Sequence, residues 1–193
     1  MKPQQILARL ALAVIALVVL LGCGRKPVIG LLLPSTGTAA SYGTAMKAGI
    51  DMAIDEATAA GTLPSGIQFV WADSGSDPDQ AVRELRRLAD AGARLVIVGT
   101  TSDEAKALLP VLEETNTLAL SPSASAPSLT KDSRLFFRVF ASDELEGRRA
   151  GRFLREDQDR SSALIFAEDS EQARGIEPPF RQVFEQAMGG QVV

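Results

Sequence analysis

Small hydroxyl-bearing residues gather in three short stretches of this sequence, each directly after an apolar run. The stretches are Ser35–Gly43, Thr100–Ser102 and Ser121–Ser125. Hydroxyl groups and the free N–H groups at a helix start can together hold a carboxylate or an amide without a charged side chain. Each stretch taken singly is better explained by helix caps and turns. Three such stretches together favour a binding site for a small polar ligand.

Catalysis and metal binding find little support in the composition. The chain contains no His and a single Cys. The commonest general base and the commonest metal ligand are therefore missing, and neither an internal disulfide nor a cysteine zinc cluster can form. Neither a G-x-x-x-x-G-K-[ST] loop nor a G-x-G-x-x-G motif follows the first apolar run. We therefore expect no enzyme, no cofactor and no metal.

The charge of the chain argues against nucleic acid as a partner. Its net charge is −4, and it is more acidic still without Lys2 and Arg9, which lie in a leader-like segment. An acidic surface does not attract a phosphate backbone.

The apolar runs alternate with helical patterns along the chain. Strands are predicted at 28–33, 67–71, 95–98, 117–120, 135–140, 163–166 and 191–193. Helices are predicted at 41–60, from Asp77 to Ala91, at 103–114, 143–155 and 179–188, with loops at 121–130 and 168–175. This alternation predicts right-handed βαβ units in an α/β fold, a parallel sheet with helices on both faces. The three hydroxyl-rich stretches would then meet at the carboxyl edge of the sheet.

Residues 1–22 have the features of a secretory signal, with Lys2 and Arg9 before the apolar run 10–21. As a helix that run is roughly 18 Å long, too short to cross a bilayer. Leu20-Leu21-Gly22-Cys23 resembles the lipobox of bacterial lipoproteins, which implies cleavage before Cys23 and acylation of that residue. The alternative is an ordinary signal peptide or anchor with an incidental Cys. Residues 23–27 would form a short tether.

Five stretches of the sequence resemble one known family. They are VIGLLLPSTGTAASYGTAMKAGIDMAIDEATAAG, FVWADSGSDPDQAV, LVIVGTTS, LALSPSASAPSLT and LFFRVFASDELEG. In this order they resemble the type I periplasmic solute-binding proteins of branched-chain amino-acid ABC transporters, the Leu/Ile/Val-binding group. The resemblance covers Val28 to about Gly147 and continues more weakly to Val193.

The resemblance implies a two-lobed protein that closes on an amino acid. Residues 28–140 would form the first lobe, and 141–193 the start of an incomplete, truncated second lobe. In the family, loops after the third and fourth strands hold the ligand's carboxylate and amino groups, and an aromatic residue after the first strand lines the side-chain pocket. The implied ligand-binding residues here are Tyr42, Thr101, Ser102, Ser123, Ala124 and Ser125.

Two positions depart from the family pattern. Asp103 stands where a Ser or Gly is usual, and Gln172 and Ala173 replace a Tyr–Gly pair of the second lobe. A carboxylate suits the first turn of a helix but would repel a ligand carboxylate. Asp103 could therefore be a cap that faces solvent, or it could mark a ligand that is not a plain branched-chain amino acid.

The function implied by the resemblance is that of a lipid-anchored solute-binding protein on the periplasmic face of the bacterial envelope. It would bind an amino acid or similar small polar solute and deliver it to an ABC permease in the inner membrane. The alternative is an envelope lipoprotein of the same fold that acts as a sensor or regulator.

Overall fold

A parallel β-sheet forms the centre of the computed structural model, which describes residues 26–193. The predicted signal peptide and Cys23 lie outside the described residues. Five strands pair in the order β2-β1-β3-β4-β5, all parallel. Their bounds are β1 Val28–Leu33, β2 Gln68–Asp73, β3 Ala93–Val98, β4 Leu118–Ser121 and β5 Phe136–Arg138. The predicted α/β architecture is confirmed, although β5 is shorter than the run 135–140.

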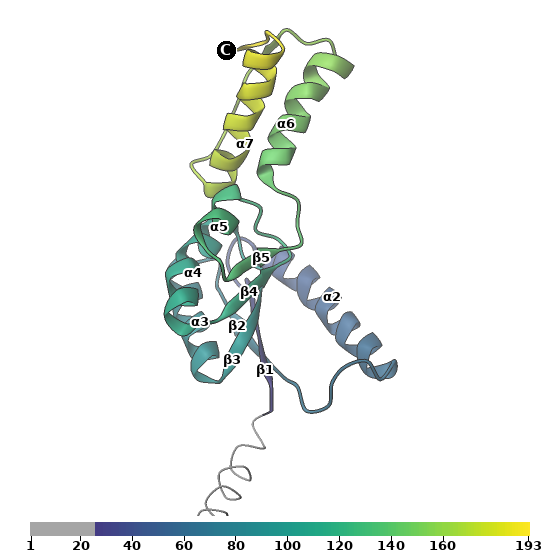
Figure 1. Cartoon of the computed structure of the whole chain (residues 1–193), viewed down its shortest axis with the longest axis vertical. Coiled ribbons are helices and arrows are strands. Elements are labelled where there is room, and N and C mark those ends of the chain that lie inside the picture. Colours follow the sequence, from purple (N-terminus) through teal and green to yellow (C-terminus); the bar gives the residue numbers. More distant parts are fainter. Residues whose placement is uncertain (1–25) are drawn as a thin grey trace, which may run out of the picture.

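Helices lie on both faces of the sheet (Figure 1). Helix α2 (Ala40–Ala59) lies on one side, and α3 (Pro78–Asp90) and α4 (Ser102–Thr115) pack together on the other. A short helix, α5 (Pro127–Asp132), follows β4. Within the part of the chain that the structure describes, the helices are too short or too polar to cross a membrane.

The two faces of the sheet are buried to different extents. On the α3–α4 face, strand residues such as Leu32 and Val96 pack with Leu85 and Leu108 of the helices, all fully buried. On the α2 face, Ile97 is only half-buried, and α2 itself fully buries only Gly43. Apolar burial, the main stabilising contribution, is therefore concentrated on the α3–α4 face.

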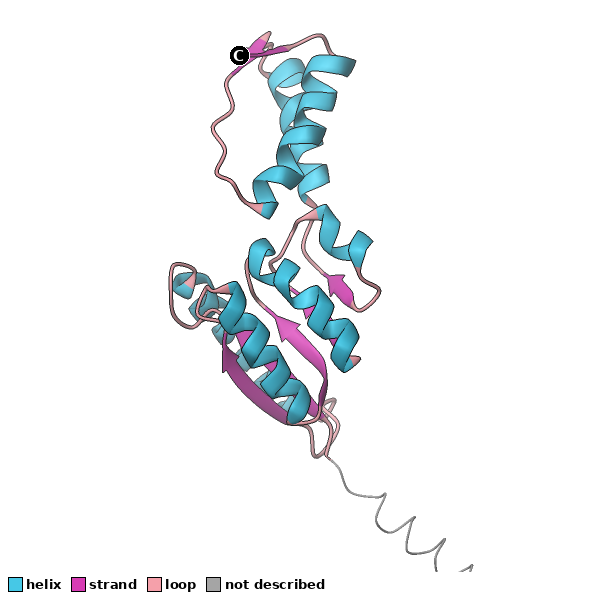
Figure 2. Cartoon of the chain, turned by 90° about the vertical axis from the view of Figure 1, so that its left-hand side faces the viewer, coloured by secondary structure: helices cyan, strands magenta, loops and turns pink. Residues whose placement is uncertain are grey.

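A pair of helices lies beyond the carboxyl ends of the strands (Figure 1). We call this part of the chain the second lobe, and the part around the five-stranded sheet the first lobe. These are α6 (Asp143–Arg152) and α7 (Glu171–Arg181), and each continues into a π-helical turn, at Phe153–Asp157 and Gln182–Ala187. The helices lie side by side in both views (Figure 2). They approach closely at Gly147 and Gly151 of α6, where an added Cβ would meet backbone atoms of α7. Strands β6 (Ser162–Ala163) and β7 (Gln191–Val192) form a small parallel sheet beside them.

The helix predicted at 179–188 is present but begins earlier than predicted, at Glu171, and continues through the π-helical turn to Ala187. The predicted loop 168–175 is therefore wrong from Glu171 onward. The Ser170 hydroxyl accepts a hydrogen bond from the Ala173 backbone N–H at 3.2 Å and caps the helix there. Pro178 and Pro179 lie inside the helix.

Two further predicted elements need correction. Only Ser162 and Ala163 of the second-lobe strand pair with a neighbour, whereas Phe166, inside the predicted 163–166, is almost fully exposed. The predicted loop 121–130 contains the start of α5, where Pro127 occupies the first helical position.

Candidate functional site

A cleft of about 620 Å³ lies between the carboxyl ends of the strands and the second lobe. The first lobe supplies most of its walls, from the loops that follow β1, β2, β3 and β4 and from the first turns of α2 and α4. Chain segments beyond β5 close the opposite side with Phe140, Glu168, Ser170 and Gln172. The cleft is therefore shared between the two lobes.

Five of the six predicted ligand-binding residues line this cleft, namely Tyr42, Thr101, Ser102, Ser123 and Ser125. The sixth, Ala124, is buried next to them without lining the cleft. Its backbone N–H donates to the Ser121 hydroxyl at 3.0 Å and is therefore not free. The three hydroxyl-rich stretches thus converge as the parallel topology predicts.

The Ser102 hydroxyl links two of these loops. Its oxygen accepts hydrogen bonds from the backbone N–H groups of Ser125, at 3.2 Å, and Ala126, at 3.3 Å. A serine hydroxyl has one proton to donate besides its two acceptor positions. Ser102 therefore keeps a donor, which suits a ligand carboxylate or carbonyl.

The hydroxyls of Ser123 and Thr101 are already used in different ways. Ser123 donates its proton to the Thr100 carbonyl at 2.8 Å, so that its oxygen remains as an acceptor. Thr101 forms a capping box with Glu104: the Thr101 hydroxyl accepts from the Glu104 N–H at 3.3 Å, and the Glu104 carboxylate accepts from the Thr101 N–H at 2.8 Å. Ser123 therefore suits a donor such as an ammonium group.

Tyr42 stands at the rim of the cleft, in the first turn of α2, with 71% of its surface exposed. The position of this turn depends on Gly43, because a Cβ there would collide with the carbonyl oxygen of Pro34. In the Tyr–Gly pair, Tyr42 thus supplies an exposed aromatic ring, and Gly43 allows the first turn of α2 to pack closely against the backbone of Pro34.

Asp73, at the end of β2, holds the loop that leads to Tyr42. Its carboxylate accepts hydrogen bonds from the Ser35 N–H (2.8 Å), the Thr36 N–H (3.2 Å) and hydroxyl (2.7 Å), and the Gly75 N–H (2.9 Å). Partial burial raises the pKa of Asp73, but these hydrogen bonds outweigh it and lower the pKa below its usual value. Sequence reasoning missed this contact, since the residues lie far apart in the chain.

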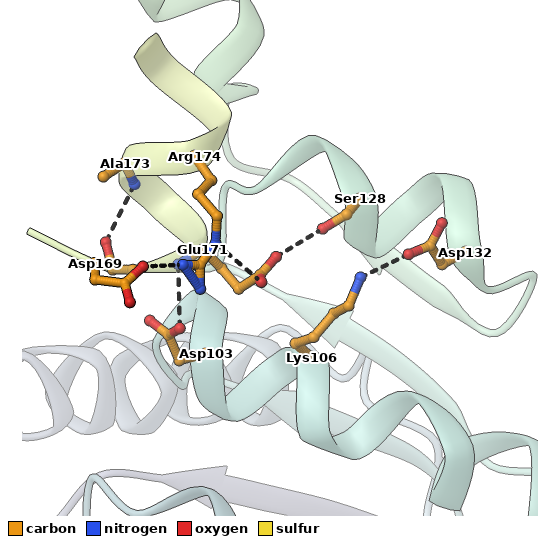
Figure 3. Close-up of polar contacts among 9 residues, drawn as sticks. Asp103, Lys106, Ser128, Asp132, Asp169, Glu171, Ala173 and Arg174 are labelled. Carbon is orange, nitrogen blue, oxygen red and sulfur yellow. Dashed lines mark hydrogen bonds and ion pairs between the residues drawn. The ribbon is translucent and has the colours of Figure 1, made fainter. Parts of the chain in front are cut away.

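Asp103 joins the two lobes. Its carboxylate accepts a hydrogen bond from the backbone N–H of Glu171, the first residue of α7, at 3.1 Å (Figure 3). Asp103 therefore caps a helix of the other lobe, which corrects the prediction of a cap that faces solvent. The charged residues that line the cleft are Asp103, Glu104 and Glu168. The described residues contain no cluster of three or more His, Cys, Asp or Glu that could hold a metal ion.

Known proteins resemble this chain in both sequence and fold. The sequence model of the periplasmic binding protein family matches residues 27–193. The leucine-, isoleucine-, valine-, threonine- and alanine-binding protein of Pseudomonas aeruginosa is 29% identical over 161 residues, which make up 82% of this chain and 43% of the relative.

Two solved structures superimpose closely. The branched-chain amino-acid transporter substrate-binding protein LivJ of Streptococcus pneumoniae, in complex with isoleucine, has a TM-score of 0.77 at 25% identity over 88% of this chain and 48% of its own. The solute-binding protein of an ABC transporter from Rhodopseudomonas palustris, in complex with 3,4-dihydroxybenzoic acid, has a TM-score of 0.77 at 20% identity, over 86% and 46% of the two chains.

The parallel sheet, the helices on both of its faces and the cleft at the carboxyl ends of its strands define the α/β fold of a type I periplasmic binding protein. With residues 27–193 matched, the chain belongs to the periplasmic binding protein family, and the named relatives confirm the resemblance to its Leu/Ile/Val-binding group. The chain spans about half the length of these relatives.

Proposed function

We propose that this chain is the solute-binding component of an ABC transporter and that it binds an amino acid or a similar small polar solute. The observation that carries the proposal is the convergence of Tyr42, Ser102 and Ser123 on one cleft between the lobes. The relative from Pseudomonas aeruginosa is named for binding leucine, isoleucine, valine, threonine and alanine. The crystal structure of LivJ contains isoleucine.

The hydrogen-bonding groups that remain free in the site match the carboxylate and the ammonium group of an amino acid. Ser102 retains a donor for the carboxylate at the N-terminal end of α4, where the helix dipole also favours negative charge. Ser123 retains an acceptor for the ammonium group. The exposed Tyr42 ring covers the side chain of the solute by apolar contact.

Calorimetric titration with L-leucine and a panel of other amino acids tests this proposal. A hydrogen bond to a charged group contributes about 1.5–3 kcal/mol, so we expect Ser102→Ala and Ser123→Ala each to weaken binding roughly tenfold or more. Thr130→Ala, at an exposed position outside the cleft, serves as the control. Unaltered affinity in both cleft variants would show that the solute binds elsewhere. Binding of 3,4-dihydroxybenzoate without binding of any amino acid would show that the solute is an aromatic acid and not an amino acid.

We further propose that the protein is a lipoprotein, held on the extracytoplasmic face of the membrane through acylated Cys23, where it meets the permease. The Leu-Leu-Gly-Cys junction after a short apolar run supports this proposal. Metabolic labelling with a fatty-acid analogue should mark the wild type and leave Cys23→Ser unmarked. Equal labelling of the two would show that Cys23 is not the anchor.

A further inference from the structure

Two helices from different lobes meet end to end at the edge of the cleft. Asp103 is the second residue of α4, and Glu171 is the first residue of α7. The Asp103 carboxylate accepts the Glu171 N–H at 3.1 Å (Figure 3). The first N–H groups of any helix have no partner within the helix. At α7, Ser170 satisfies the N–H of Ala173, and Asp103 satisfies that of Glu171 from the other lobe.

The charge of Asp103 suits this position between the helices. The N-terminal end of each helix carries a partial positive charge, so that α4 and α7 would repel each other weakly if they met alone. A carboxylate between them is attracted to both ends. Hydrogen bonds with a charged acceptor are also stronger than neutral ones.

The surrounding contacts hold α7 in the position that this bond requires. The Ser128 hydroxyl of α5 donates to the Glu171 carboxylate at 3.3 Å. A Cβ added at Gly175 would lie 2.7 Å from Pro127 Cδ, so the helix is in direct contact with α5 there. Lys106 of α4 pairs with Asp132 of α5 at 2.6 Å and ties those two helices together (Figure 3).

We propose that Asp103 is an interlobe latch, a positioning residue that holds α7 against α4 in the absence of solute. The latch determines what fraction of the protein is closed before the solute arrives. The apparent affinity for the solute then scales with that fraction. The proposal rests on the proposed function in one respect only, namely that this cleft is where the solute binds.

The N–H of Glu171 can be removed without unfolding the helix. Proline is favoured at the first helical position, and Ser170 before it already has the extended backbone that a following proline requires. Glu171→Pro therefore deletes the donor, whereas Glu171→Ala deletes the side chain and keeps the donor. This pair of variants separates the latch from the contact with Ser128.

The distance between the lobes is the direct measurement. Spin labels at Arg83→Cys in α3 and Arg152→Cys in α6, both at exposed positions, would report it by double electron–electron resonance, without solute, in a chain that also carries Cys23→Ser. We expect Asp103→Ala and Glu171→Pro each to raise the ratio of open to closed protein about tenfold, as befits one charge-assisted bond. The double variant should show no further increase, and Glu171→Ala should match the wild type.

The contrary results are equally definite. An unchanged distance distribution in Asp103→Ala would overturn the latch, as would an equal shift in Glu171→Ala and Glu171→Pro. Titration with the amino-acid panel separates this from the proposed function. If the variants change the spin-label distances but no amino acid binds, the proposed function is rejected and the latch is supported. If an amino acid binds but the distances do not change, the latch is rejected and the proposed function is supported.

Discussion

At the scale of single residues, polar side chains around the cleft are engaged with the backbone before any solute arrives. Ser102 accepts two N–H groups, and Asp73 accepts hydrogen bonds from three residues of two loops. These bonds stabilise the fold, because a buried polar group without a partner costs the free energy of its desolvation. The groups that remain free are few, and their donor or acceptor character limits which solute can bind.

Asp73 should make the stability of the first lobe depend on pH. Its pKa is lower in the folded chain than the usual value of 3.8, so the carboxylate contributes stability above pH 3.8 that is lost as the pH falls through the folded pKa. We expect Asp73→Asn to lower the free energy of unfolding by about 1–2 kcal/mol at pH 7, allowing for solvent screening. The difference should shrink as the pH falls below 3.8 and through the lower pKa of the folded state.

Urea unfolding followed by the fluorescence of Trp71, the single Trp of the chain and a β2 residue, measures this effect. Asp90→Asn, at an exposed position at the end of α3, is the matched control and should have the same free energy of unfolding as the wild type at pH 7. A pH-independent difference for Asp73→Asn would show that its charge is not what matters.

At the scale of elements, local capping signals located helix starts better than prolines did. The Asp77 carboxylate caps α3, where the sequence placed the start of a helix, and Thr101 and Glu104 form a capping box at the start of α4. The predicted start at Pro179 was wrong, because Ser170 caps the helix further upstream. Both prolines lie inside α7.

Helix α2 offers a sharp comparison between two of its glycines. A Cβ at Gly43 would collide with the Pro34 carbonyl, whereas a Cβ at Gly49 meets nothing within 4 Å. We expect Gly43→Ala to destabilise the protein by about 1–3 kcal/mol through overpacking. Gly49→Ala should stabilise it by roughly 0.5–1 kcal/mol, since alanine is the better helix former. Thermal unfolding of both variants measures these changes in stability. Equal changes in the two variants would show that the backbone does not approach Gly43 closely.

At the scale of the whole molecule, long-range contacts are what the sequence could not predict. The strand–helix alternation predicted the sheet, and the parallel topology predicted the convergence of Ser102 and Ser123 on one cleft. The bonds from Asp73 to Ser35 and from Asp103 to Glu171 join residues far apart in the chain, with no local pattern that marks them. Both became visible only when the elements were placed in space.

The position of β1 in the sheet has a consequence for how the chain folds. This strand lies between β2 and β3, so that Val28 pairs with Gln68 on one side and Ala93 on the other. Parallel neighbours cannot be joined by a tight turn, and the entropy of closing such long loops slows folding. During synthesis Leu31, Leu32 and Leu33 therefore emerge long before the strands that will cover them. Until Val98 has been added, β1 lacks its β3 neighbour, and apolar segments exposed in this way are prone to aggregation.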